Sequence, residues 1–278
     1  MIFIRKLFLW TLLLSGFSLS ASALDIEGSL VQGGFAYGKV APGSTVWLDN
    51  KPIYVGEEGD FVLGFGRDHP AQSRLSISSP TTNSMETHTL DIADRDFDIE
   101  RVNGLPPKTV SPPPEWAARR KLETGRVAKG RAAVSTDTFW KTGFIKPAKG
   151  RFSGFYGSQR ILNGKPRSPH YGLDIAGPIG TPIYAPAGGK VTLAAPDFLL
   201  EGGIVIIDHG YGVSSTLFHM DTVTVSEGQI IEQGDPIGTI GEKGRASGPH
   251  VDWRLNWRSV RLDPALVIGL EGATSGTS

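Results

Sequence analysis

The sequence predicts a mainly β protein with two β-rich regions joined by a linker and a helix. Its 278 residues include 36 glycines and 19 prolines, which interrupt the chain too often for long helices and favour turns and short strands. Apolar and polar residues alternate along much of the chain, as they do in half-buried strands. The 39% hydrophobic content is ordinary for a globular protein of one or two domains.

Charge and cysteine content exclude several classes of function. Lysine plus arginine and aspartate plus glutamate each number 28, so no overall field favours nucleic acid or an anionic membrane surface. The sequence contains no cysteine, which excludes disulfides, thiolate metal ligands and a lipid anchor on cysteine. Any metal site must therefore use histidine and carboxylate side chains.

The first residues have the pattern of a signal peptide, which we place at residues 1–23. Arg5 and Lys6 precede an apolar run, and Ala21-Ser22-Ala23 supplies small residues before a cleavage point. We expect the mature chain to begin at Leu24 and to be exported, without a stable membrane span. An uncleaved anchor is the alternative, but the apolar run is short for a span of about 20 residues.

Residues 24–102 are expected to form a small antiparallel β-sandwich. Strand-like alternation continues through this region, with reversals expected at Asp49-Asn50 and Glu58-Gly59. Such a domain can bind or position a partner, or it can act as a spacer that merely packs against its neighbour.

Residues 103–143 are expected to form a proline-rich linker followed by a helix. Five prolines lie between residues 106 and 114, which favours extended polyproline geometry. Pro114 is tolerable in the first turn of the helix, and Trp116, Leu122 and Val127 are candidates for its apolar side. The basic residues on the helix predict a solvated face, with an anionic polymer or membrane surface as the alternative partner; they are Arg119, Arg120, Lys121, Arg126, Lys129 and Arg131.

Residues 144–270 contain the first pair of candidate metal ligands, and residues 271–278 are expected to be a flexible tail. His170 and Asp174 are four apart, a spacing that places both on one face of a helix or of a strand. Pro169 and Gly172 favour the strand. Gly172 would then leave an open space between the two ligands that a metal ion can occupy.

A second pair and a further histidine follow the same logic. His250 and Asp252 are two apart, so a strand would point both to one side. His219 closes an apolar strand and could be presented to a cleft. The opposite face of the second strand would carry Val251, Trp253 and Leu255.

These residue types suit a catalytic zinc ion. Such an ion takes three protein ligands and keeps a position for water, whose pKa falls to about 7. His170, Asp174 and Asp252 could supply the ligands to one zinc per chain. An uncoordinated histidine could accept a proton from the water or stabilise an oxyanion, and His219 and His250 are the candidates.

The sequence around these residues resembles that of the lysostaphin-type (LytM-like) zinc metallopeptidases. The stretches "PHYGLDIAGPIGTPIYAPAGGKV", "IIDHGYGVSSTLFHM" and "EGQIIEQGDPIGTIGEKGRASGPHVDWRL" carry the resemblance, which runs from Arg151 to Pro264. It implies a compact, mostly antiparallel β domain with a groove, in which His170 and Asp174 bind zinc while His219 and His250 are catalytic. It also implies a peptidase that cleaves peptide cross-links of bacterial peptidoglycan.

One departure from the family pattern leaves two functions open. The family has a second histidine as third zinc ligand where this sequence has Asp252. Carboxylate oxygen is a legitimate zinc ligand, so the site can be active with one histidine and two aspartates. Alternatively, the protein is an inactive regulator that activates a cell-wall amidase. A third hypothesis is a peptidoglycan-binding module whose affinity resides in the N-terminal domain.

The expected substrate and compartment follow from the resemblance together with the export signal. A Gram-negative periplasmic enzyme of this type would meet peptidoglycan stem peptides, which predicts cleavage of D-alanyl-diaminopimelate cross-links. Glycine-glycine bonds are the other chemistry that the resemblance implies.

Overall fold

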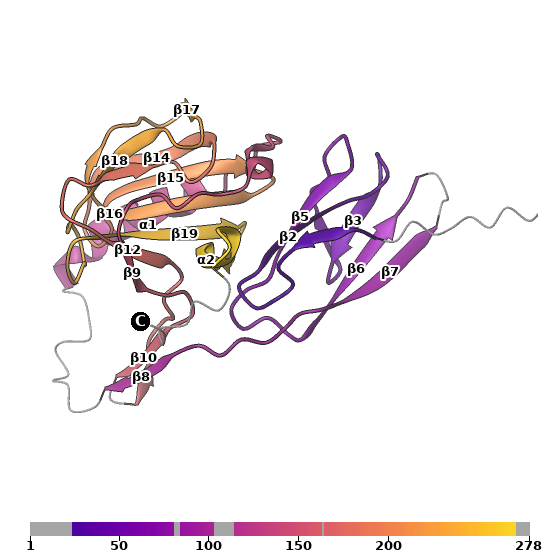
Figure 1. Ribbon diagram of the computed structural model, residues 1–278, viewed down its shortest axis with the longest axis horizontal. Coiled ribbons are helices and arrows are strands. Elements are labelled where there is room, and N and C mark those ends of the chain that lie inside the picture. Colours follow the sequence, from indigo (N-terminus) through magenta and orange to yellow (C-terminus); the bar gives the residue numbers. More distant parts are fainter. Residues whose placement is uncertain (1–23, 81–83, 103–113, 163, 271–278) are drawn as a thin grey trace, which may run out of the picture.

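The computed structural model describes residues 24–80, 84–102, 114–162 and 164–270 as two β-rich lobes side by side (Figure 1). The expected signal peptide, the proline-rich stretch and the C-terminal tail lie outside the described residues. In the part that is described, no helix combines the length and apolar character needed to cross a membrane. The mainly β prediction is confirmed, whereas the domain boundaries stay predictions.

The N-terminal lobe consists of two antiparallel sheets whose buried side chains belong to one hydrophobic cluster. One sheet has the order β1 (Ile26–Gly28), β2 (Phe35–Lys39), β5 (Asp60–Gly64), and the other has β4 (Lys51–Ile53), β3 (Thr45–Leu48), β6 (Gln72–Ser78), β7 (Met85–Asp91).

Local sequence explains these strands and one of their turns. In β6 the buried residues Ser73, Leu75 and Ile77 alternate with more exposed ones, which is the period of a strand with one face in the core. Asp49 and Asn50 connect β3 to β4 with φ of 48° and 63°. Short polar residues tolerate this left-handed region, so the reversal expected there is present.

The C-terminal lobe is built on one large antiparallel sheet. Its main path is β17 (Ile230–Ile231), β14 (Gly189–Phe198), β15 (Gly202–Gly210), β16 (Val213–Val223), β19 (His250–Trp257), β12 (Leu173–Ala176), β9 (Arg151–Gly154), with β13 (Pro182–Tyr184), β18 (Pro236–Ile240) and β20 (Val260–Leu262) attached at its sides. The helices are η2 (Pro114–Trp116), α1 (Ala117–Arg131), η3 (Phe139–Thr142) and α2 (Pro264–Val267).

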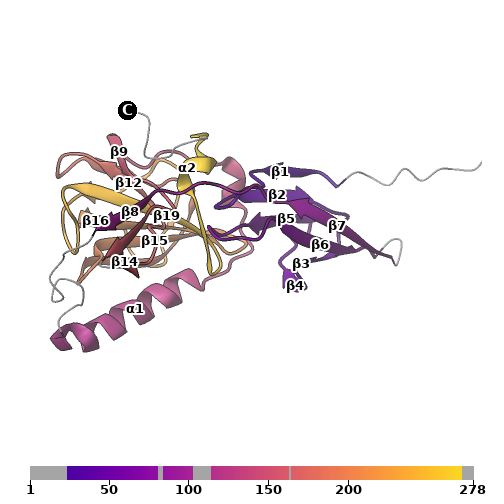
Figure 2. The same cartoon turned by 90° about the horizontal axis from the view of Figure 1, so that it is seen from below.

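The central strands of this sheet are covered on both faces. All nine residues of β15 are buried. On one face, Val127 of α1 joins a cluster that includes Ile206 and Phe218, and α1 runs along this side of the lobe (Figure 2). Because directly opposed residues of neighbouring strands share a face, Asp252, which is opposite Phe218, lies on the side of the sheet that α1 partly covers.

The helix expected after the linker is present, but the apolar side predicted for it is wrong at two of three positions. Trp116 is 36% exposed and Leu122 is 73% exposed, whereas Val127 is buried. The buried face instead comprises Glu123, Val127 and Gly130. A Cβ at Gly130 would lie 3.3 Å from the Cβ of Leu193, so glycine permits the close approach of helix and sheet.

Three of the six basic residues on α1 are paired with carboxylates. Three of its arginines, Arg119, Arg120 and Arg126, therefore attach the helix to the sheet and its loops through Asp197, Glu201 and Glu227. Ion pairs link Arg119 to Glu123 and Asp197, Arg120 to Glu123 and Glu201, and Arg126 to Glu227.

A segment that follows the N-terminal lobe extends to the C-terminal lobe. There β8 (Ile99–Val102) pairs in parallel with β10 (Gln159–Leu162), which also pairs with β11 (Lys165–Pro166), and both views show β8 on that side (Figures 1 and 2). Just before β8, the ring of Phe97 lies against Gly157, where a Cβ would come within 2.0 Å of it. Arg67 donates from Nε to the carbonyl of Gly157 at 2.8 Å.

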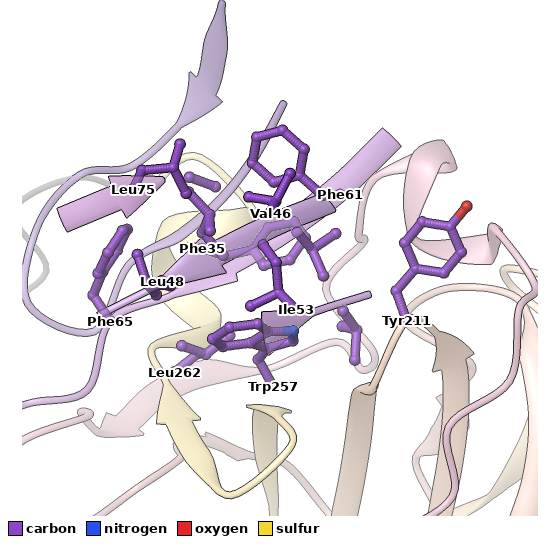
Figure 3. Close-up of a cluster of buried hydrophobic side chains, with 14 of the residues drawn as sticks. Phe35, Val46, Leu48, Ile53, Phe61, Phe65, Leu75, Tyr211, Trp257 and Leu262 are labelled. Carbon is purple, nitrogen blue, oxygen red and sulfur yellow. The ribbon is translucent and has the colours of Figure 1, made fainter. Parts of the chain in front are cut away.

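The two lobes also share a hydrophobic core. Trp257 and Leu262 of the C-terminal lobe lie in one cluster with Phe35, Ile53 and other residues of the N-terminal sheets (Figure 3). The Trp257 side chain packs against Gly64 of β5, where a Cβ would meet it at 3.0 Å. The lobes are therefore joined by packed apolar surface as well as by the chain.

Replacing Trp257 by alanine is expected to lower the free energy of unfolding by about 3–5 kcal/mol, because it leaves a large cavity between the lobes. Urea denaturation followed by circular dichroism measures this. The matched control is Trp116→Ala, which removes the same side chain from an exposed position and should change stability by about 0.5 kcal/mol or less. Equal stability of the two variants would contradict a shared core.

Candidate metal centre

Two neighbouring strands bring the two candidate carboxylate ligands together. Asp174 in β12 is directly opposite Asp252 in β19, so both side chains leave the same face of the sheet. His170 lies just before β12, and one ligand atom from each of these three residues falls within 4.8 Å of the others. The structure thus unites residues that are about 80 positions apart in the sequence.

The prediction that one strand contains both His170 and Asp174 is wrong. β12 begins at Leu173, so only Asp174 is in the strand and His170 is in the preceding loop. The loop position is fixed by two backbone hydrogen bonds: the His170 N–H donates to the carbonyl of Ser158, and the Gly157 N–H donates to that of His170, each at 2.8 Å. These non-local bonds replace the strand geometry.

Gly172 has a different role from the one expected. The space beside it is occupied by Asp252, because a Cβ at Gly172 would lie 2.0 Å from the Oδ1 of Asp252. A side chain at this position would displace that carboxylate. Glycine is therefore needed here so that Asp252 can approach the segment that carries the other two ligands.

Unsatisfied polar atoms show that these residues fit a metal ion. Nε2 of His170 and Oδ1 of Asp174 form an ion pair at 3.2 Å, but both atoms are buried and neither makes a well-aligned hydrogen bond with any described residue. Buried polar atoms are seldom left unpaired, because desolvation without a partner is costly. Imidazole nitrogen and carboxylate oxygen are both zinc ligands, so a zinc ion would satisfy the two atoms together.

Asp252 is held by an arginine two residues further along its strand. Arg254 donates from Nη2 to Oδ2 of Asp252 at 2.6 Å, and from Nε to Oδ2 at 3.0 Å and to Oδ1 at 3.2 Å. Burial would raise the pKa of Asp252, but the charges of Arg254 and His170 hold the pKa at about 2. The carboxylate is thus ionised, with Oδ2 directed to Arg254 and Oδ1 beside Gly172.

His170 experiences the same carboxylates. Burial disfavours its charged form, but the nearby carboxylates of Asp174 and Asp252 outweigh burial and raise the pKa of His170. The site therefore attracts positive charge, which is the electrostatic requirement for a cation site.

The two candidate catalytic histidines lie next to each other at this site. The ring centroids of His219 and His250 are 4.8 Å apart. Nδ1 of His219 donates to the carbonyl of Lys243 at 2.8 Å, and Nδ1 of His250 donates to that of Gly248 at 2.7 Å. These bonds fix the tautomers and leave Nε2 of each ring available. Nε2 of His250 lies 3.9 Å from Oδ1 of Asp174.

His219 does not end its strand as predicted. It lies inside β16, which continues to Val223, and its φ is 62°. Residues other than glycine rarely adopt this conformation, and it tends to occur where a side chain must be aimed at a site. Burial lowers the pKa of His219, and the nearby His250 lowers it further, so His219 is neutral at pH 7 and able to accept a proton.

His209 is a buried histidine that belongs to the core. Its Nδ1 donates to the carbonyl of Gly188 at 2.6 Å, and its Nε2 accepts from the hydroxyl of Ser215 at 2.9 Å. The hydroxyl oxygen of Ser215 in turn accepts from Nε1 of Trp253. Both ring nitrogens of His209 are therefore satisfied, and burial lowers the pKa of His209 to about 4.

Because the pKa of His209 is lowered in the folded protein, we expect the free energy of unfolding to fall at acidic pH. An exposed histidine has a pKa of about 6.5, so between pH 6.5 and 4 the unfolded chain binds more protons than the folded chain, and stability falls as pH falls. Between pH 7.5 and 5 the loss should be about 2 kcal/mol. Urea unfolding at both pH values measures it. His209→Gln, which cannot titrate, should show a smaller loss, and an unchanged pH dependence would contradict the assignment.

From the sequence, no role was assigned to Arg254 or Arg261, and the pairing of Arg254 with Asp252 was not detected. A usable signal was present, because aspartate and arginine two apart on a strand share a face. No local pattern could have indicated that Arg131, at the end of α1, hydrogen-bonds to Thr216 of β16 at 3.3 Å.

Comparison with known families identifies the region that contains this site. Residues 168–264 match the model of the family described as Peptidase family M23. They form an M23 peptidase domain. The resemblance drawn from the sequence is confirmed, and the three candidate metal ligands and the two neighbouring histidines all lie inside the matched residues.

Two relatives of the M23 domain are named as peptidoglycan DD-endopeptidases. ShyA and ShyB of Vibrio cholerae are 36% identical over 88 residues and 33% identical over 95 residues. These matches cover 32% and 34% of this chain, but only 20% and 22% of the relatives. This chain therefore spans only about a fifth of the length of either relative.

A solved structure resembles both lobes. A crystal structure assigned to peptidase M23 from Pseudomonas aeruginosa covers 87% of this chain, and the match includes 96% of that protein. The TM-score is 0.66 and the sequence identity is 29%. The likeness therefore extends well beyond the M23 domain.

Proposed function

We propose that this protein is a zinc-dependent endopeptidase that hydrolyses peptide cross-links of peptidoglycan. The observation that carries the proposal is the pair of orphaned buried atoms on His170 and Asp174, which lie with Asp252 in one group. The M23 domain and the two DD-endopeptidase relatives support the reaction class.

In this proposal His170, Asp174 and Asp252 hold one zinc ion, which when bound would polarise the peptide carbonyl and make water more acidic. The neutral His219 is suited to take a proton from the attacking water. His250, whose Nδ1–H is held by Gly248, presents Nε2 to the same space and can stabilise the developing oxyanion or protonate the leaving amine.

We propose a D-alanyl-diaminopimelate bond as the substrate and the periplasm as the compartment. The names of the relatives support the first. The second rests on the signal-peptide pattern of residues 1–23.

Metal analysis combined with a muropeptide assay tests the proposal. The purified chain should contain about one zinc per molecule and release soluble products from cross-linked peptidoglycan. A chelator should abolish release, and zinc should restore it. A chain that lacks zinc under conditions that do not strip metal would overturn the proposal, and activation of a cell-wall amidase by that chain would support a regulator instead.

A further inference from the structure

The face of the sheet that carries Asp252 continues into a group of arginines. Along β19, Arg254 and Asn256 follow Asp252 at intervals of two and therefore share its face. Arg254 is directly opposite Thr216 of β16. Asn256 is directly opposite Arg261 of β20 and accepts a hydrogen bond from Nη1 of that arginine.

A third arginine reaches the same place from the helix. Arg131, in the last turn of α1, donates from Nε to the hydroxyl of Thr216 at 3.3 Å. Arg131, Arg254 and Arg261, which we call the arginine cluster, thus come from three different elements. Arg254 is in direct contact with Asp252, so the cluster borders the candidate metal centre.

The cluster has more positive charge than its carboxylate neighbour can balance. Asp252 pairs with Arg254, but neither Arg131 nor Arg261 forms an ion pair with any described residue. Burial, followed by the charges of Arg261 and Arg254, lowers the pKa of Arg131 to about 9. Burial and Arg254 also lower the pKa of Arg261. The three other arginines of α1 all have carboxylate partners, so Arg131 differs from them in having none among the described residues.

Unpaired, partly buried charges of like sign are costly unless an anion joins them. Arg254 remains 26% exposed, and Arg131 and Arg261 are also only partly buried, so all three side chains keep some contact with solvent. Guanidinium groups present planar forks of N–H donors that match a carboxylate. The cluster therefore has both the charge and the donors for an anionic group.

We propose that the arginine cluster is a subsite that binds a free carboxylate of the peptide substrate beside the candidate metal centre. This inference rests on the proposed function for the identity of the ligand. In a D-alanyl-diaminopimelate cross-link the carboxyl of the donor D-alanine forms the bond to be cleaved, and the free carboxylate next to that bond is on diaminopimelate. The subsite would align that bond with the metal centre.

Binding without turnover tests the subsite independently of catalysis. The metal-stripped full chain is titrated calorimetrically with the stem tetrapeptide in its free-acid form and in a form with all carboxylates amidated. The acid should bind about tenfold more tightly or better, since hydrogen bonds to charged groups are among the strong ones. Arg131→Gln and Arg261→Gln should each reduce this preference to about threefold or less.

The matched control is Arg126→Gln, which removes an arginine of the same helix whose partner is Glu227; it should keep the full preference. Thermal unfolding of each variant shows whether it folds. Arg131→Lys retains charge without the fork and should give an intermediate preference, so it also serves if Arg131→Gln does not fold. A merely structural role would change the unfolding temperature and leave the preference intact.

Three further results distinguish between ligands and between the two proposals. Inorganic phosphate that binds through Arg131 and Arg261, with no preference for acid over amide, would overturn the carboxylate subsite. Equal binding of acid and amide to the wild type would do the same, even if zinc-dependent hydrolysis is found. Preference without any hydrolysis in the zinc-loaded chain would support the subsite and overturn only the proposed function.

Discussion

Replacing Asp252 by alanine is expected to weaken zinc binding by more than about 100-fold, because even the partners that orient a ligand are worth about 10–100-fold in metal affinity. The loss has two causes. The change removes one of three candidate ligands, and it leaves the cation of Arg254 unpaired next to the metal position. Elemental analysis after dialysis, and competition with a chromogenic chelator, measure the affinity.

A set of variants separates these two causes. Asp252→Ala should also lower the free energy of unfolding of the metal-free chain by about 3 kcal/mol, because a partly buried charge loses its partner. Asp252→Ala combined with Arg254→Met should recover much of that stability without recovering zinc. Asp252→His supplies a neutral zinc ligand and should retain the metal. Wild-type zinc affinity in Asp252→Ala would show that Asp252 is not a ligand.

Replacing His250 by alanine is expected to reduce turnover of cross-linked muropeptides by about 10²–10⁴-fold, the range associated with loss of a group that transfers a proton. Zinc content should stay within about twofold of wild type, since His250 is outside the group of three ligands. His250 lies at the candidate metal centre, with its ring centroid 4.8 Å from that of His219 and its Nε2 3.9 Å from Oδ1 of Asp174. Steady-state assays and metal analysis on one preparation provide both values.

The control for this variant is His88→Ala, which removes a histidine of β7 in the N-terminal lobe and should leave turnover unchanged. Undiminished turnover in His250→Ala would remove the catalytic role of His250 and leave the metal assignment standing. Loss of zinc together with turnover would instead make His250 a fourth ligand.

The β architecture could be predicted from the sequence because its determinants are local. Glycine and proline prevent long helices in the C-terminal half, and alternation marks strands such as β6. The faces of β19 were also predictable, since Val251, Trp253 and Leu255 are fully buried opposite the face with Asp252. A period of two assigns faces without knowledge of the partner strand.

Features that depend on distant partners could not be predicted. The prediction of the buried side of α1 was wrong at Leu122. Glu123 is buried in its place, with Arg119 and Arg120 as ion partners. His170 is fixed in a loop by Ser158 and Gly157. The pairing of Asp174 with Asp252 depends on the register of two strands far apart in the sequence, which no local pattern sets.

Residues just before β8, together with Arg67, connect the N-terminal lobe to the loop that carries the candidate metal ligand His170. Asp98 accepts a hydrogen bond at 2.8 Å from the N–H of Gln159, and Phe97 and Arg67 contact Gly157, whose own N–H binds the carbonyl of His170. A chain shortened to its C-terminal half would lose this support and leave the His170 loop free to move. Truncation would thus act as a mutation of the candidate metal centre, because Arg67, Phe97 and Asp98 support it from outside the site.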